Sequence, residues 1–170
     1  MLALIYNSSF LNLLVEKLIK RAKEKGIDVE DVLIREISKE DPQEGIKLRI
    51  EIAEKYMNEA YEYLKKGDSI QASEKAYKVA EEVVKALAEK FNTEEYKQAI
   101  TEGRWYTYLL ASTTNDLSKR LGDWVSDGWN AGYVLHIWGF YEGKLSVNKN
   151  TVNMEKVKKM LENAKSVLMS

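Results

Sequence analysis

Apolar residues recur at helical spacing along almost the whole chain, and this periodicity is the feature that most restricts its fold. In the first segment they fall at positions i, i+3, i+4, i+7 and i+11, as a single helical stripe requires. The apolar-polar alternation of β-strands is absent, and Pro42 is the only proline. The chain is therefore predicted to be all-α. The residues of that first stripe are Leu11, Leu14, Val15, Leu18 and Ala22.

Two capping signals divide the middle of the chain. In "DPQE", Asp41 has the position of an N-cap, Pro42 comes first in the helix, and Glu44 completes a capping box. The stretch "KKGDSIQ" ends one helix at a glycine and starts the next at an aspartate. Helices are predicted over 42–66 and 68–91, and so short a turn between them predicts an antiparallel pair.

Other helices are predicted on both sides of this pair. The first begins at Ser8 or Ser9, and another covers 28–40. A third runs from 92 to 121, where Gly103 is a candidate interruption, and the last two cover 123–143 and the C-terminal segment to Leu168. The expected fold is an up-and-down bundle of six or seven helices. It forms one domain, 1–170, in which an N-terminal extension, 1–40, packs on a bundle made of 41–170.

The composition excludes several classes of site. There are 26 basic and 27 acidic residues, for a net charge of −1, whereas nucleic-acid-binding proteins carry a basic excess. Charge therefore gives no support to nucleic-acid binding, although a local patch stays open. The chain has no cysteine and one histidine, so neither a disulfide nor a metal site is expected, and no cofactor is indicated.

The N-terminal segment is apolar but has neither the basic start nor the cleavage site of a signal peptide. No apolar run reaches the about 18 residues that a membrane-spanning helix needs. A cytoplasmic protein without a membrane partner is expected.

One helix, predicted between Asp123 and Gly143, is unlike the others. At about 100° per residue, its four glycines share a stripe of about 60°, aromatic residues form a second stripe, and His136 projects between them. A glycine inside a helix costs roughly 1 kcal/mol relative to alanine, so four of them indicate close approach of another backbone. The glycines are Gly128, Gly132, Gly139 and Gly143.

Three interpretations of this helix stay open: the centre of the core, the interface with a second copy, or the wall of a ligand pocket. The first interpretation has the glycines facing the 68–91 helix. The candidate pocket or interface residues are Trp129, Gly132, Tyr133, His136, Gly139, Tyr141 and Glu142.

The segments "KGDSIQASEKAYKVAEEVVKALA" (66–88) and "LHIWGFYEG" (135–143) resemble the archaeal PaREP family. This family belongs to the wider HEPN-like superfamily of helical proteins, and the resemblance extends over nearly the whole chain from about residue 10. It implies an archaeal source, a HEPN-like bundle and pairing as a homodimer.

Many HEPN proteins are ribonucleases with an Arg-x(4–6)-His motif, in which arginine stabilises phosphate charge and histidine transfers protons. For His136 that arginine would be at 129, 130 or 131. Those positions hold Trp129, Asn130 and Ala131, and the nearest upstream arginine is Arg120. No catalytic residue is therefore assigned, and His136 is expected to be structural.

The function that the sequence favours is a non-catalytic helical module that dimerises and binds a protein, nucleotide or RNA. The resemblance adds a minimal nucleotidyltransferase as a protein partner. Two alternatives stay open: an enzyme of phosphoryl chemistry, such as a ribonuclease, that uses His136, and a binder of a small ligand.

Overall fold

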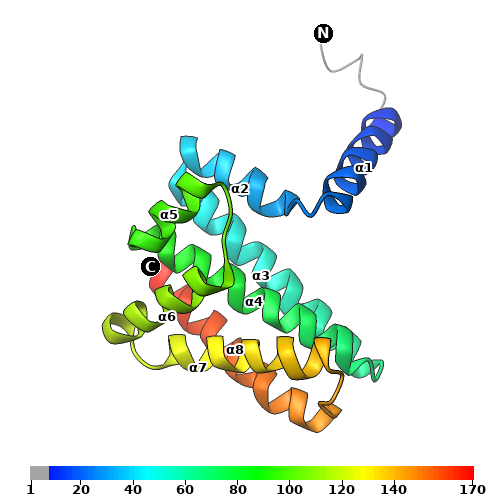
Figure 1. The fold of residues 1–170 in the computed structure, drawn as a ribbon, viewed down its shortest axis with the longest axis vertical. Helices are drawn as coiled ribbons and strands as arrows, with labels where there is room; N and C mark the ends of the chain where they lie inside the picture. Colours follow the sequence, from blue (N-terminus) through cyan, green and yellow to red (C-terminus); the bar gives the residue numbers. More distant parts are fainter. Residues whose placement is uncertain (1–7) are drawn as a thin grey trace.

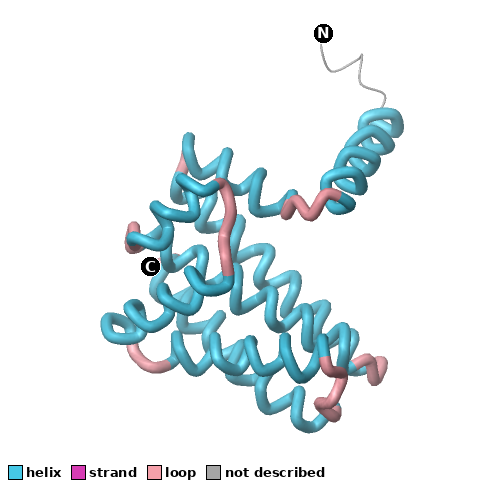
Figure 2. The backbone as a smooth tube through the Cα atoms, in the orientation of Figure 1, coloured by secondary structure: helices cyan, strands magenta, loops and turns pink. Residues whose placement is uncertain are grey.

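The computed structural model describes residues 8–170, and all regular structure in that range is helical (Figure 2). The apolar periodicity therefore predicted the fold class correctly. The elements of the described range are α1 (Ser8–Glu24), α2 (Val29–Glu40), α3 (Pro42–Lys65), α4 (Ser69–Lys90), α5 (Glu94–Glu102), α6 (Thr107–Leu121), α7 (Trp124–Val134), the π-helix η2 (Leu135–Tyr141) and α8 (Val147–Leu168).

The helices α3 and α4 are an antiparallel pair that lies side by side along the molecule (Figure 1). The two aspartates cap the helix starts as the sequence predicted, but Glu44 does not complete a capping box, because the Asp41 N–H donates to the Ile37 carbonyl at 2.9 Å. The Asp41 carboxylate accepts a hydrogen bond from the Glu44 backbone N–H at 3.1 Å, and that of Asp68 accepts one from Gln71 at 2.9 Å. Each cap satisfies a backbone donor that has no partner within its helix.

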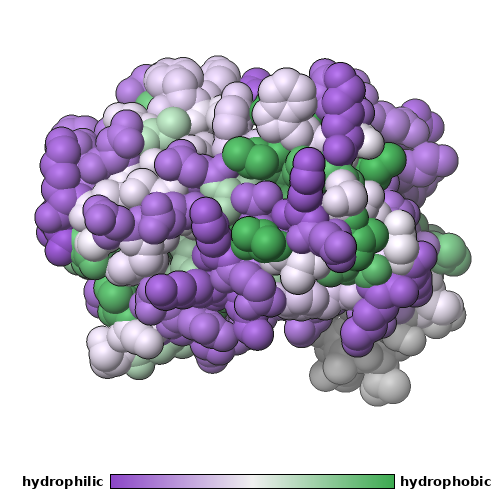
Figure 3. All heavy atoms as spheres, turned by 90° about the horizontal axis from the view of Figure 1, so that it is seen from below, coloured by the Kyte–Doolittle hydropathy of each residue, from purple (hydrophilic) through white to green (hydrophobic). Residues whose placement is uncertain are grey.

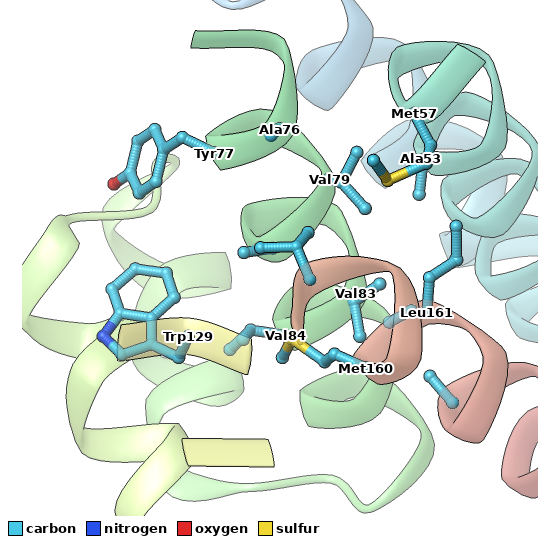
Figure 4. Close-up of a cluster of buried hydrophobic side chains, with 14 of the residues drawn as sticks. Ala53, Met57, Ala76, Tyr77, Val79, Val83, Val84, Trp129, Met160 and Leu161 are labelled. Atoms are coloured by element: carbon cyan, nitrogen blue, oxygen red, sulfur yellow. The ribbon is translucent and has the colours of Figure 1, made fainter. Parts of the chain in front are cut away.

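The core is built around α4, which contacts α3 on one side and α7, η2 and α8 on the others. Small residues of α4 let these neighbours approach closely. In Figure 4, Val79, Val83 and Val84 of α4 lie among side chains from α3, α7 and α8. Since α4 is buried on almost every side, the sides of α3, α7, η2 and α8 that contact it form the core.

The predicted helix over 92–121 is two helices, so the described chain has eight α-helices and a π-helix in place of six or seven. Gly103 ends α5 in a left-handed conformation, with φ of 74°. The N–H of Arg104 then bonds back to the carbonyl of Ala99 at 3.1 Å, which closes the end of the helix. Tyr106 is extended, so that α6 starts in a new direction.

The N-terminal extension has two parts that behave differently. The helix α2 packs on α3 and buries Ile34, whereas α1 projects away from the bundle (Figure 1). In the described residues α2 makes the contact with α3, and the packing of 1–40 as one extension on a bundle of 41–170 stays a prediction. Residues 1–7 lie outside the described range. Because the described range itself begins at Ser8, the expected start of this helix at Ser8 or Ser9 stays a prediction.

Candidate functional site

The glycine face of the helix formed by α7 and η2 points into the molecule. A Cβ atom added to Gly132 would lie 2.8 Å from the Cβ of Ala80, and one added to Gly139 would lie 2.6 Å from the Cβ of Ser73. Both neighbours belong to α4. At these two glycines, the close approach that the sequence predicted is made within one chain, as the core interpretation expected, and not across an interface.

The fourth glycine of the predicted stripe does not belong to it. Gly143 follows the end of η2, is exposed, and has a φ of 59°. Its role is to turn the chain, because this conformation is costly for residues with a side chain. Only the first three glycines form a buried face, since Gly128 lies against Met160 of α8.

The helix widens to a π-helix where the glycine face passes Ser73. The N–H of Glu142 bonds to the carbonyl of Ile137, five residues earlier, at 3.0 Å. Such π-helical segments are rare and occur often at functional sites. The wider turn changes the direction of the side chains from Leu135 to Tyr141, which a projection at a constant angle cannot anticipate.

The face opposite the glycines is aromatic and open to solvent. Trp138 is 49% exposed and Tyr141 is 68% exposed, and Tyr133 and Val134 beside them are also exposed. Trp129, which the sequence grouped with them, is buried near Tyr77 of α4 (Figure 4). We call Tyr133, Val134, Trp138 and Tyr141 the aromatic face.

His136 lies at the edge of the aromatic face in a fixed position. Its Nδ1 is 3.2 Å from a carboxylate oxygen of Glu74, and its ring stacks on Tyr77 with centroids 4.0 Å apart. The ring of Tyr141 meets it edge-on at 4.8 Å. The imidazole is therefore surrounded by a carboxylate and aromatic rings, an environment that orients it and also holds Tyr141 in place.

Glu142, one of the candidate pocket or interface residues, is exposed and pairs with Lys144 at 3.4 Å. The partner of His136 is Glu74 of α4, which the sequence analysis did not single out. The available signal was its spacing: Glu74 precedes Tyr77 by three residues, so both lie on the side of α4 that faces η2.

A second concentration of polar chemistry lies inside the bundle, where the sequence analysis expected none. Arg49 is 1% exposed, and its guanidinium contacts Asp31 and Glu82, each at 2.9 Å. Lys85 pairs with Glu82 at 2.9 Å and with Asp31 at 3.7 Å. Glu89 lies 3.9 Å from the Arg49 Nε. We call these five residues the buried ionic network.

Electrostatics within the network fix its charges. Burial alone would raise the pKa of Glu82, but Lys85 and Arg49 outweigh it and lower that pKa to about 2. The acids Glu82 and Asp31 likewise raise the pKa of Arg49 against the effect of burial. In Glu89 burial dominates and raises the pKa of the carboxyl. Three helices, α2, α3 and α4, are joined by these charges.

A cavity of about 340 Å³ opens beside the network, between α2, α4 and the loop from α5 to α6. Its wall includes Asp31, Arg35, Glu81, Lys85 and Trp105. The acids and bases of this wall are near balance, and Asp31 already pairs with Arg35 and Lys85. With its main charges neutralised internally, the cavity has little to attract an ion, and we assign the network a structural role.

Two further kinds of site are not found in the described residues. Over 8–170, no three side chains of histidine, aspartate or glutamate come together as ligands of a metal ion would. None of the helices in this range combines the length and the hydropathy that crossing a bilayer requires.

Comparison with known proteins identifies the family of the chain. The model of the archaeal PaREP1/PaREP8 family matches residues 48–161. The chain belongs to this family. The match includes Arg49, Glu74, Glu82 and His136. It leaves out α1 and α2, and with α2 it leaves out Asp31 of the buried ionic network.

A solved relative supports the assignment to the PaREP1/PaREP8 family. It is the crystal structure of a protein from Sulfolobus solfataricus, 34% identical, with a TM-score of 0.63. The similarity covers 67% of the present chain and 93% of that one. No curated protein matches the chain.

Proposed function

We propose that this PaREP1/PaREP8 protein is a non-catalytic helical binding module, and that its aromatic face receives a protein partner. The observation that carries the proposal is the division of the α7 and η2 helix into two faces. The glycine side is used up in packing against α4, and the opposite side leaves Tyr133, Trp138 and Tyr141 in solvent. Tryptophan and tyrosine are the residue types that dominate binding energy at protein interfaces.

The surroundings of the aromatic face support the same function. Seen from below in Figure 3, the side of the molecule along which α7, η2 and the start of α8 run shows separate hydrophobic areas among hydrophilic ones. Such a mixed surface is compatible with an interface between proteins that also exist apart, because these interfaces are about as apolar as the rest of a protein surface. The stacked pair of His136 and Tyr77 positions Tyr141 before binding, which lowers the entropy cost of association.

A place in the HEPN-like superfamily is part of this proposal. Resemblance to that superfamily suggests a minimal nucleotidyltransferase as the partner. The catalytic members of the superfamily use an arginine that this chain lacks at 129–131, and the carboxylate and aromatic contacts of His136 favour a positioning role.

Binding can be tested with paired variants and a minimal nucleotidyltransferase as the partner. Native mass spectrometry should show a complex for the wild type and at least a tenfold weaker one for Trp138→Ser combined with Tyr141→Ser. Tyr108→Ser removes an aromatic side chain of similar exposure from α6 and should leave the complex unchanged. Equal loss in both variants, or no complex, would contradict the proposal.

The absence of catalysis has a separate test. Purified wild-type protein should leave single-stranded RNA intact in the presence of a chelator. If it cleaves RNA and folded His136→Ala does not, the protein is an enzyme.

A further inference from the structure

The helix α1 carries an apolar stripe that nothing in the described chain covers. Leu14 is 42% exposed and Leu18 is 59% exposed, and Phe10, Leu11 and Val15 around them are also in solvent. An isolated helix of this length is marginally stable in water, and most helices depend on packing of their apolar face. The stripe therefore calls for a partner surface.

The helix α2 has a matching stripe on its outer side. Its inner side buries Ile34 against the bundle, but Leu33 and Ile37 point outward and are 57% and 41% exposed. Both stripes have two large residues four positions apart. In an antiparallel pair, moving four residues back along α1 corresponds to moving four residues forward along α2. A register in which Leu18 faces Leu33 therefore also places Leu14 opposite Ile37.

The charges of the two helices are complementary. The helix α1 has four basic and two acidic residues, whereas α2 has four acidic and two basic ones. Opposite net charges on facing helices favour association and disfavour the pairing of like helices, because two α1 helices would repel each other. Charge thus selects α2, and not another α1, as the surface that fits α1.

The α1 of the same chain does not reach this surface. Backbone bonds of 2.9 Å from Gly26 to Lys23 and 3.0 Å from Ile27 to Ala22 close the end of α1. Lys23 pairs with Glu30 at 3.9 Å, and α1 leaves the bundle at an angle to α2 (Figure 1).

We propose that α1 docks on α2 of a second copy of this chain, and that the exchange is reciprocal. Each chain then gives one helix and receives one, so a closed two-fold dimer makes the contact twice and covers both stripes. This inference goes beyond the proposed function and does not depend on it, since the aromatic face stays free for another protein.

Light scattering on the full chain tests the dimer. Wild type should have twice the chain mass at tens of micromolar, and Leu14→Glu combined with Leu18→Glu should have the mass of one chain. Asn12→Glu adds one negative charge to the polar side of α1, as many as each of the two leucine substitutions, and should stay dimeric. Leu33→Glu changes α2, the surface that receives α1, and should also give a monomer. A monomeric wild type, or a dimer that survives both apolar variants, would overturn the inference.

Cysteine cross-linking tests the exchange itself, and the absence of native cysteine makes the result unambiguous. Leu18→Cys combined with Leu33→Cys should give covalent dimers on mild oxidation. Covalent monomers would mean that α1 folds back on its own α2, and equal cross-linking of Leu18→Cys alone would mean that two α1 helices pair. Either result overturns the exchange. The partner assay separates the two proposals, because the double glutamate variant should still bind the nucleotidyltransferase.

Discussion

Arg49 is a single cation held among acids inside the bundle, and its removal should be costly. In Arg49→Met, Asp31, Glu82 and Glu89 would stay buried with Lys85 beside Glu82 and Asp31 and with Arg35 beside Asp31, so Glu89 would lose the cation next to it. Loss of one partner from a buried ion pair costs about 3–5 kcal/mol. We expect the free energy of unfolding, measured by denaturant titration, to fall by about that amount.

An exposed ion pair is the control for Arg49. Lys39 and Glu36 pair at 2.7 Å on the surface of α2, where such pairs contribute about 0–1 kcal/mol. Lys39→Met should therefore change stability by less than about 1 kcal/mol. Similar losses in the two variants would show that the buried network does not hold α2, α3 and α4 together.

The lowered pKa of Glu82 makes a prediction about acid. Because its pKa is about 2 in the folded state and 4.5 is its ordinary value, ionised Glu82 stabilises the fold above about pH 4.5. That contribution should be lost as the pH falls from about 4.5 to 2. The raised pKa values of Glu81 and Glu89 make the fold more stable as these carboxyls become protonated, which opposes the loss from Glu82. The stability of the wild type alone therefore does not isolate the contribution of Glu82.

A comparison with Glu82→Gln isolates this group. The stability difference between wild type and Glu82→Gln should be largest at neutral pH and should shrink below about pH 4.5. Urea titrations at a series of pH values give the free energy of unfolding of each variant. A difference that is constant from pH 7 to 3 would contradict the assignment of Glu82 as the ionised centre of the network.

At the scale of single residues, the sequence predicted local roles such as helix caps better than contacts between residues far apart in the chain. Asp41 and Asp68 were predicted as caps from local spacing alone, since a cap bonds to a backbone group three residues on. Glu74 could not be assigned to His136 in the same way, because 62 positions separate them. The network had a local signal that was missed: Arg49 interrupts the apolar stripe of Ile46, Ile50 and Ala53.

At the scale of elements, Gly132 tests whether its face is internal. Gly132→Ala would bring a methyl group to 2.8 Å from the Cβ of Ala80, forcing α7 and α4 apart. Overpacking costs about 1–3 kcal/mol, and the helix propensity of alanine returns about 1 kcal/mol, so a net loss of up to about 2 kcal/mol is expected. Thermal unfolding checks it.

Asn130→Ala is the matched substitution on an exposed position of the same helix, where added stability of up to about 0.5 kcal/mol is expected. If Gly132→Ala is as stable as Asn130→Ala, the glycine face is not packed as tightly as the structure has it.

The ends of helices were predictable where a local sequence signal marks them, whereas the change from an α-helix to a π-helix at η2 was not. Gly103 could be recognised as an interruption because glycine adopts the left-handed conformation readily. The π-helix has no comparable signal: it depends on how η2 packs against α4, and that contact joins distant parts of the chain. For the same reason the sequence could name the 68–91 helix as the neighbour of the glycines in one interpretation, but it could not choose between that interpretation and an interface or a pocket.

At the scale of the whole molecule, periodicity was enough to predict the all-α class, and packing between segments was not predictable. The apolar stripes of α1 and α3 are similar in sequence, yet α3 is covered by the bundle and α1 stands apart from it. A stripe shows that a helix needs a partner surface without showing whose surface it is. This is why the aromatic face and α1 lead to proposals about other molecules.

The central claim, that the aromatic face receives a protein partner, is tested most directly by hydrogen exchange of the chain with and without the nucleotidyltransferase. On binding, amide exchange should slow across 133–142 and should not change across α5 and the start of α6, where Tyr108 lies. Protection elsewhere on the molecule, with 133–142 unchanged, would contradict it.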